Sequence, residues 1–164
     1  YDINDKIIRV SIDNPMDVWY WKEYKSKPDD WYKFKAYLRI NKNGYKRYVI
    51  TIDTKKYILS RVIYKCFNNE WDITDVSQNN FIDHINRNSL DNRIVNLRVL
   101  TQQQNQFNRN ARGTTFIVSD NCWRAQLRIN GKRYTKQGFD TEELAHQHYL
   151  ILKQKYHIIP DNIY

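Results

Sequence analysis

The sequence predicts an α+β protein, and two kinds of pattern support that fold class. Runs of aromatic and β-branched residues flank Asn-Gly pairs at residues 43–44 and 130–131, an arrangement typical of β-hairpins. Residues 59–67 and the segment after Asp140 instead carry apolar side chains at helical spacing. We expect three parts: a β-rich region at residues 1–56, a central region at residues 57–110 and a small module of three strands and a helix at residues 111–164.

The first part is expected to hold a β-hairpin. The run from Trp31 to Ile40 alternates in part between apolar and polar side chains, and the run from Tyr48 to Ile52 is rich in β-branched residues. Between them, Asn43 and Gly44 supply residues that tolerate left-handed backbone. Residues 1–30 have no clear pattern, and their tryptophans fit a core or an interface equally well.

The second part begins with a short amphipathic helix. Its apolar residues fall on one helical stripe, namely Leu59, Val62, Ile63, Cys66 and Phe67. A polar stretch follows, and then the segment 81–110, in which Asp91-Asn92 indicates a turn. After that turn, apolar residues at 94, 97 and 99 lead into a stretch rich in Gln and Asn that we expect to be helical.

The third part predicts three strands and a helix. Residues 114–118 and 123–129 have strand character, and Asn130-Gly131 predicts a tight turn into a strand at residues 132–137. Asp140 and Glu143 have the spacing of a helix cap and its capping-box partner. The helix that follows presents one apolar face, made of Leu144, Ala145, His148, Tyr149, Leu152 and Tyr156.

The composition points to a polyanionic partner inside the cell. The formal charge is +9 and the isoelectric point is near 9.5, so nucleic acid is the first partner to consider, although a basic protein without such a partner has the same composition. No apolar run is long enough to cross a membrane. Cys66 and Cys122 are only two and lack metal-ligand spacing, which excludes a zinc finger. They are interpreted as buried small hydrophobic residues of a protein in a reducing compartment. We therefore expect an intracellular protein, in the cytoplasm or nucleus, or in a host cell if the protein is viral.

The residues with the clearest chemistry are Asp83, His84 and Asn105. Neighbouring side chains on a strand point to opposite faces, so Asp83 can hold a metal ion while His84 reaches a substrate. Asn105 lies 22 residues after Asp83 in a helical setting, where its amide oxygen can add to a site for a hard cation. A cation and a base together are what phosphodiester hydrolysis requires.

The central segment resembles the HNH nucleases, which have the ββα-metal fold, and it is most similar to the branch found in phage and intron homing endonucleases. The resemblance covers about residues 57 to 110 and includes the helix at residues 59–67. The matching positions are Asp83-His84-Ile85-Asn86, Asn92-Arg93, Asn96-Leu97-Arg98, Thr101 and Asn105.

This resemblance implies a role for each position of the motif. Asp83 matches the metal ligand of the first strand, and His84 matches the general base that polarises the attacking water. Asn96 matches the asparagine that pins the loop between the strands and orients the histidine, and Asn105 matches a second metal ligand on the helix. Ligands of this kind suit a divalent cation such as Mg²⁺ better than Zn²⁺. Since the histidine must be neutral to act, we expect activity to fall in acid.

The third part contains Arg112-Gly113, Trp123-Arg124-Ala125-Gln126-Leu127-Arg128, Asn130-Gly131-Lys132, Phe139-Asp140-Thr141-Glu142-Glu143 and Ala145. In these positions it resembles the Apetala-two/ethylene-response-factor DNA-binding domain, which lays a three-stranded sheet into the major groove with a helix packed behind. Trp123, Ala125, Leu127 and Ile129 are expected to face that helix, and the intervening residues to face DNA. The resulting candidate DNA contacts, with two arginines of the nuclease motif, are Arg93, Arg98, Arg112, Arg124, Gln126, Arg128, Lys132, Arg133 and Thr135. The sequence departs from that family at Gly138-Phe139, which lack an intervening residue, so the third strand is expected to be shortened or bulged.

The resulting prediction is a metal-dependent endonuclease of the homing type that acts on double-stranded DNA. The alternative is a non-catalytic, sequence-specific DNA-binding regulator that uses the C-terminal sheet, and a nuclease that acts on RNA is a third option that nothing favours. No coiled-coil pattern indicates a dimer, so a monomer is favoured.

Overall fold

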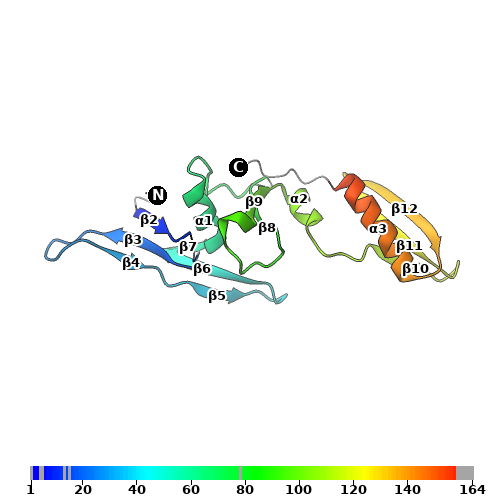
Figure 1. The fold of residues 1–164 in the computed structure, drawn as a ribbon, viewed down its shortest axis with the longest axis horizontal. Coiled ribbons are helices and arrows are strands. Elements are labelled where there is room, and N and C mark those ends of the chain that lie inside the picture. Colours follow the sequence, from blue (N-terminus) through cyan, green and yellow to red (C-terminus); the bar gives the residue numbers. More distant parts are fainter. Residues whose placement is uncertain (1, 4–5, 13, 15, 78, 158–164) are drawn as a thin grey trace. The chain divides into compact units, whose positions relative to one another are not determined.

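The structure is a computed structural model that describes residues 2–3, 6–12, 14, 16–77 and 79–157 (Figure 1). It has the predicted α+β character, with short strands and helices assembled into several small sheets. The chain divides into two compact units, Tyr1–Gln102 and Gln103–Tyr164, and each is described by itself. No helix within the described ranges is long and apolar enough to cross a bilayer.

The first unit contains three antiparallel sheets. The first has the strand order β1-β2-β3-β4, the second β5-β6-β7, and the third pairs β8 with β9. The strands are β1 (Asp2–Ile3), β2 (Lys6–Val10), β3 (Val18–Lys22), β4 (Asp30–Lys33), β5 (Tyr37–Ile40), β6 (Lys46–Ile52), β7 (Lys55–Ile58), β8 (Phe81–His84) and β9 (Leu97–Leu100).

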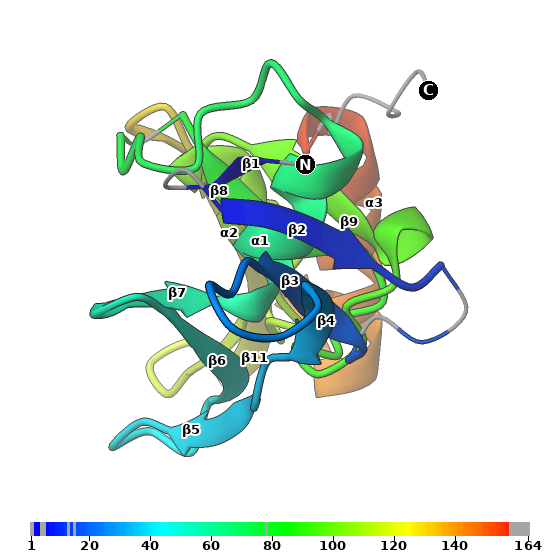
Figure 2. The same ribbon diagram turned by 90° about the vertical axis from the view of Figure 1, so that its left-hand side faces the viewer.

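One helix joins these sheets into a single core. The helix α1 (Leu59–Phe67) coincides with the predicted stripe. Leu59, Val62, Ile63 and Cys66 are fully buried, and Phe67 is partly buried. It contacts β2, β6 and β7 as well as β8 and β9 (Figure 2). The core therefore runs across residue 56, where the sequence predicts a boundary between two parts, and it includes Ile8, Val18, Ile50, Ile52 and Leu97 with the helix residues.

Two details of the first part differ from the sequence prediction, and residues 1–30, for which no pattern was clear, can be assigned where the structure describes them. The run from Trp31 to Ile40 forms two strands in different sheets, β4 and β5, because the chain leaves the first sheet after Lys33. The described residues within 1–30 form β1, β2, β3 and the start of β4, all in one sheet. In the turn between β5 and β6, Gly44 has a positive φ of 76°, but Asn43 does not adopt the left-handed conformation.

The second unit contains one sheet and the helix that covers it. The strands β10 (Thr114–Ile117), β11 (Cys122–Ile129) and β12 (Lys132–Phe139) form an antiparallel sheet in that order, as predicted. The helix α3 (Glu142–Tyr156) packs on it through a core of Ala125, Leu127, Ala145 and Tyr149. A short helix, α2 (Gln102–Phe107), begins at the boundary between the two units.

Four local predictions for this unit can be checked directly. Asn130 and Gly131 both have positive φ, as the predicted tight turn requires. The bulge expected at Gly138 is present, because Trp123 pairs with Phe139 and the next residue pairs with Gln137. Two predictions about the helix were wrong: Thr141, not Asp140, caps it by accepting a hydrogen bond from the Leu144 amide, and Leu144 is exposed instead of facing the sheet.

The two cysteines are both free, and they differ in burial. Cys66 lies in the core of the first unit, and burial raises the pKa of its thiol to about 12. Cys122, at the start of β11, is only half-buried, so the expectation of full burial holds for Cys66 alone.

Candidate active site

The predicted pair Asp83-His84 ends strand β8, and both side chains are buried. Asp83 lies opposite Arg98 in the β8–β9 ladder, and His84 lies opposite Leu97. Their exposed fractions are 6% and 8%. A strand directs successive side chains to opposite faces, so one carboxylate and one imidazole leave the same strand end in different directions.

The side chain of Asn96 ties together the loop between the two strands. Its amide oxygen accepts a hydrogen bond from the Asn86 backbone at 2.9 Å, and its amide nitrogen donates to the Asn86 side chain at 3.0 Å and the Asp91 carbonyl at 2.7 Å. Its own carbonyl accepts from the Ile85 amide at 2.9 Å. Because the residue is 6% exposed, these bonds hold the chain just after His84 in one conformation.

A second asparagine, Asn92, contacts the histidine ring itself. The Nε2 atom of His84 lies 3.1 Å from Oδ1 of Asn92, and both residues are buried. An amide oxygen can only accept, so the neutral imidazole that makes this bond carries its proton on Nε2 and its lone pair on Nδ1. Within the described residues, Nδ2 of Asn92 has no hydrogen-bond partner, although the residue is only 2% exposed.

This contact is a feature that the sequence prediction missed. Asp91-Asn92 was interpreted as a turn, and only Asn96 was assigned the task of orienting the histidine. The available signal was the position of Asn92 within the motif, eight residues after His84. Nothing in the local pattern shows that the loop returns this side chain to the ring.

The carboxylate of Asp83 forms a buried ion pair with Arg98. Oδ2 of Asp83 accepts from Nε of Arg98 at 2.9 Å, and the two side chains are 7% and 13% exposed. A carboxylate in this position requires a positive partner, because burial without one is costly. Arg98 was predicted to contact DNA; here its Nε is directed to Asp83, and contact with phosphate stays a prediction.

Arg93, another predicted DNA contact, binds Asp91 in the same loop. Its Nε and one terminal nitrogen donate to the two carboxylate oxygens at 2.8 and 2.7 Å. The hydrogen bonds from Arg93 are the main cause that lowers the pKa of Asp91 to about 2, with a further hydrogen bond from Asn86. The Arg93 side chain is 59% exposed, so it also remains open to solvent at the edge of the site.

Arg61 of α1 supports the segment that leads into β8, and the sequence analysis gave it no role. Its guanidinium donates to the carbonyls of Ile73, Asp75 and Asn80 at 2.7 to 2.9 Å. The same group lies 4.6 Å from the centre of the Trp71 ring. One side chain therefore holds the middle and the end of the polar stretch between α1 and Phe81, which fixes the start of β8.

The remaining motif residue, Asn105, lies on α2 and belongs to the second unit. It is half-buried, and Asn108 follows just after the helix. Among the described residues, no three His, Cys, Asp or Glu side chains are placed to hold a metal together. The donors that the motif offers are one carboxylate and amide oxygens, a set that suits a hard cation which keeps several water ligands.

The predicted DNA-reading face of the second unit is formed by matching positions on two strands. Gln126 pairs with Thr135 and Arg128 pairs with Arg133, so these four side chains share one face of the sheet. Arg124 lies on the same face, half-buried, and Gln126 also donates to Thr115 at 3.0 Å. The opposite face carries Trp123, Ala125, Leu127 and Ile129 and packs on α3 as predicted.

Two further predicted contacts lie away from the centre of that face. Arg112 donates to both carboxylate oxygens of Glu142 at 3.0 Å, with its side chain 81% exposed. Lys132 is exposed at the start of β12, with its ammonium 5.3 Å from the centre of the Tyr134 ring. Both remain accessible to a ligand in solution.

Comparison with known proteins agrees with the motif in the first unit. Residues 75–107 match the model of a family described as HNH endonuclease. The chain is 34% identical over 127 residues to an uncharacterised HNH endonuclease of Acanthamoeba polyphaga mimivirus. That match covers 75% of this chain and 63% of the viral protein, so the chain spans less than two thirds of its relative.

No solved structure matches the chain. The family match begins just before β8, and it includes the 3₁₀ helix η1 (Ile94–Asn96), β9 and α2. It therefore contains the histidine, its asparagine partner and the buried ion pair described above. The segment that holds Asp83, His84, Asn92 and Asn96 is therefore the part of the chain that matches the HNH endonuclease family model.

Proposed function

We propose that this protein is a DNA endonuclease that hydrolyses phosphodiester bonds, with His84 as the general base. The observation that carries the proposal is the contact between His84 Nε2 and Asn92 Oδ1 at the end of β8. It favours the tautomer in which Nδ1 has the lone pair needed to take a proton from water. Burial of the ring limits its rotation, so the base is oriented before substrate arrives.

The other buried residues support this role without taking part in proton transfer. Asn96 fixes the backbone after His84, and Asn92 fixes the ring. Arg98 pairs directly with Asp83, so a carboxylate oxygen is held one residue away from the base. A carboxylate next to an oriented histidine is suited to hydrolysis in which a cation and a base act on one phosphate.

A divalent cation, with Mg²⁺ the best fit, is the proposed cofactor. The oxygen donors of the motif fit Mg²⁺, with Asp83 as the ligand in the first unit. The resemblance to homing-type nucleases adds Asn105 as the second ligand. When bound, the cation supplies stabilisation of charge on the phosphate and on the leaving oxygen.

We further propose that the second unit binds double-stranded DNA through the outer face of its sheet, as in the Apetala-two-like domain that it resembles. The face carries Arg124, Gln126, Arg128 and Arg133, whose side chains suit base edges and phosphates. Replacement of Arg124 or Arg128 by Ala should weaken binding, by about 1–3 kcal/mol where the residue reads a base. Unchanged affinity in both variants would contradict this assignment. A site-specific, homing-type nuclease is the form of the enzyme that such a domain favours.

The test of the nuclease proposal is cleavage of supercoiled plasmid by the wild type and by His84→Ala. With Mg²⁺ the wild type should convert plasmid to nicked or linear forms, and chelation should stop the reaction. His84→Ala should bind DNA as well as the wild type and cleave much more slowly.

The alternative is a DNA-binding regulator without catalysis, and the exposed basic face of the second unit is the observation in its favour. Equal plasmid conversion by both proteins, together with normal binding of DNA, would favour that alternative over the enzyme.

A further inference from the structure

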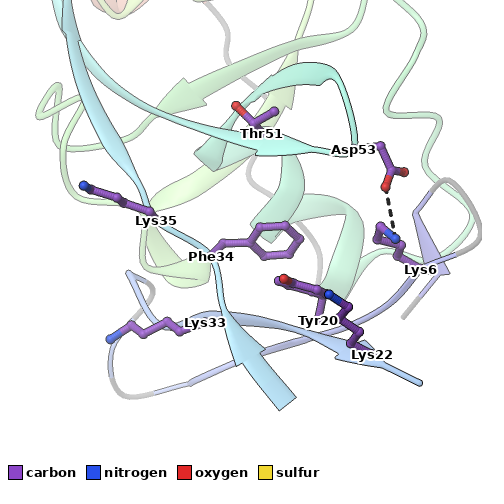
Figure 3. Close-up of a pocket in the computed structure, with 8 residues that line it drawn as sticks. All are labelled: Lys6, Tyr20, Lys22, Lys33, Phe34, Lys35, Thr51 and Asp53. Carbon is purple, nitrogen blue, oxygen red and sulfur yellow. Dashed lines mark ion pairs between the residues drawn. The ribbon is translucent and has the colours of Figure 1, made fainter. Parts of the chain in front are cut away.

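The first unit has a hollow of about 390 Å³ lined mainly by basic and aromatic side chains (Figure 3). Tyr20 and Phe34 lie together in it, with ring centres 4.6 Å apart. The complete lining is Lys6, Tyr20, Lys22, Lys33, Phe34, Lys35, Thr51 and Asp53. None of these residues belongs to the candidate active site or to the DNA-reading sheet of the second unit.

The charges in this hollow are only partly neutralised within the protein. Lys6 pairs with Asp53 at 3.0 Å, and Lys33 pairs with Asp17 outside the hollow. Within the part of the chain that the structure describes, Lys22 and Lys35 pair with no carboxylate. The hollow therefore has a net positive charge that a ligand can meet.

A second hollow of about 520 Å³ adjoins the first on the β5–β6–β7 sheet. It is lined by Tyr37, Leu38, Arg39, Val49, Thr51 and Lys56, so the two hollows have Thr51 in common. Together they form a continuous surface with six basic residues and one acidic residue, Asp53. We name this surface the basic groove.

The strand pairing beside the groove places like charges opposite each other. Arg39 on β5 lies directly across from Arg47 on β6, an arrangement that destabilises a sheet unless an anion is present. The segment from residue 35 to residue 52 has five basic residues and no acidic residue. The counter-charge for this pair must therefore come from elsewhere in the protein or from a ligand.

The β5–β6 hairpin is hydrogen-bonded to the loop that follows His84, the proposed general base. Ser89, in the loop between His84 and Asn96, donates a hydrogen bond to the carbonyl of Lys46 at 2.6 Å. Both belong to the first unit. A phosphate chain bound along this hairpin would therefore lie on the same compact unit as the histidine.

We propose that the basic groove binds the sugar-phosphate backbone of duplex DNA next to the bond that is cut. The proposal rests on the nuclease function proposed above. Arg39 lies on β5, Lys56 lies on β7, and the other four basic residues of the groove precede β5 in the chain. The strand β6 lies between β5 and β7, and neighbouring strands are about 4.8 Å apart. A single phosphate cannot meet charges spread over about 10 Å, but a polymer of phosphates can.

The experiment measures binding of a fluorescent 30-base-pair duplex of random sequence over a series of salt concentrations. Both proteins compared carry His84→Ala, so the duplex stays intact. One also carries Lys35→Gln, Arg39→Gln and Lys56→Gln, which remove three charges from the groove. Loss of three phosphate contacts should reduce the slope of log affinity against log salt by about 2.7. The affinity ratio of parent to variant should then be about 40-fold larger at 50 mM than at 200 mM salt.

The matched control removes the same charge outside the groove. Lys25→Gln, Lys55→Gln and Lys155→Gln alter exposed residues that do not line either hollow. We expect the slope of log affinity against log salt for this triple variant to differ from that of the parent by less than about 0.9, the value for one phosphate contact. Equal changes in slope for the two triple variants, or no binding by the parent, would overturn the proposal.

A second measurement works even where the groove variant folds poorly. Acetylation of the parent protein, followed by mass spectrometry, compares lysines with and without the duplex. Lys35 and Lys56 should become protected, and Lys25 and Lys55 should not; uniform modification of all four would contradict the groove. Both binding tests use the His84→Ala protein, so their results do not depend on whether the wild type cleaves plasmid. A negative result in the binding tests likewise leaves the result of the plasmid assay unchanged.

Discussion

Replacement of Asn92 by Leu should reduce catalysis while leaving stability almost unchanged. Leu keeps the branched shape of the side chain and removes both the oxygen that accepts from His84 and the unpaired Nδ2 atom. Loss of the buried, unpaired amide nitrogen is favourable by about 1–3 kcal/mol, and loss of a partner for the histidine N–H is unfavourable by about the same amount. The two effects oppose each other, so the free energy of unfolding should stay within about 2 kcal/mol of the wild type.

The effect on the rate is expected to be much larger than the effect on stability. Without Asn92, the His84 ring loses the contact that favours a proton on Nε2 and restrains the orientation of the ring. Partners that orient metal-bound histidines contribute about 10- to 100-fold to metal affinity or activity, and we expect a partner that orients a general base to have an effect of the same order. We therefore expect the rate of plasmid cleavage at saturating DNA to fall by about that factor.

Three measurements separate an orienting role from a structural one. Urea unfolding gives the stability, single-turnover plasmid cleavage gives the rate, and ¹⁵N spectra of the His84 ring show which nitrogen carries the proton. In the wild type that nitrogen should be Nε2, and in Asn92→Leu the two tautomers should mix. Asn92→Asp is the matched variant, because its carboxylate still accepts the bond and also favours the protonated ring. The acid limb of its rate profile should therefore move to higher pH.

The reasoning is refuted by a specific pattern of results. An Asn92→Leu protein that unfolds easily but cleaves plasmid at the wild-type rate would show that the contact serves stability alone. A variant with unchanged stability, rate and ring spectra would show that the contact has no consequence. Only a loss of rate without a comparable loss of stability agrees with an orienting role.

Three further changes test the structure at other points. Gly113→Ala should destabilise the second unit by about 2–5 kcal/mol in thermal unfolding, because φ is +65° and the new Cβ would overlap the buried ring of Tyr149. Gly131→Ala is the control, because its Cβ would have no atom within 4 Å; it should show only the backbone cost of about 1–2 kcal/mol. Arg98→Met should lower the free energy of unfolding by about 3–5 kcal/mol, because it removes the cation paired with the buried Asp83 carboxylate. Asp83→Asn in the same chain should restore most of that stability. Wild-type stability with weaker DNA binding would instead assign Arg98 to phosphate. Because the pKa of Asp91 is lowered to about 2, its ion pair stabilises the fold at pH values above the ordinary pKa of 3.8, and this stabilisation is lost as the pH falls to about 2. The difference in the free energy of unfolding between the wild type and Asp91→Asn should therefore disappear over that pH range. Urea unfolding at a series of pH values measures it, and a constant difference would contradict this prediction.

The elements that local sequence predicts well are those with a local cause. Asn130-Gly131 forms a tight turn because both residues adopt positive φ, and the strands on either side follow from it. The helix at residues 59–67 was predicted with the correct bounds because its apolar stripe has one period and one buried face. The bulge at Gly138 followed from a single missing residue.

The division of the run from Trp31 to Ile40 between two sheets had no such local signal. Alternation of apolar and polar residues is similar on both sides of the break, so the pattern is that of one strand. The chain changes sheet where Phe34 and Ala36 pack against the core. That core is built from β2, β6 and α1, and its position depends on residues far away in the sequence.

The candidate site shows the same division between local and distant causes. Asp83 and His84 were found because they are adjacent and follow an apolar pair at the start of a motif. Their partners depend on strand register and loop path, since Arg98 meets Asp83 only through the β8–β9 ladder, and Asn92 meets His84 only because the loop folds back. Sequence spacing therefore proposes the reactive groups, and it misses the contacts that Arg98 and Asn92 make with them.

The distribution of buried polar side chains favours function over stability as the reason for this arrangement. Among the described residues, six polar or charged side chains are buried, and four of them are Asp83, His84, Asn92 and Asn96. Each costs free energy to bury unless its hydrogen bonds are complete, and Asn92 leaves one donor unpaired. Apolar residues at these positions would stabilise the core at lower cost, as Leu59, Val62 and Ile63 do in α1. The fold accepts this cost in one segment, and that segment is the one that matches a nuclease family. This agrees with the proposed need to hold a carboxylate and an imidazole in fixed positions.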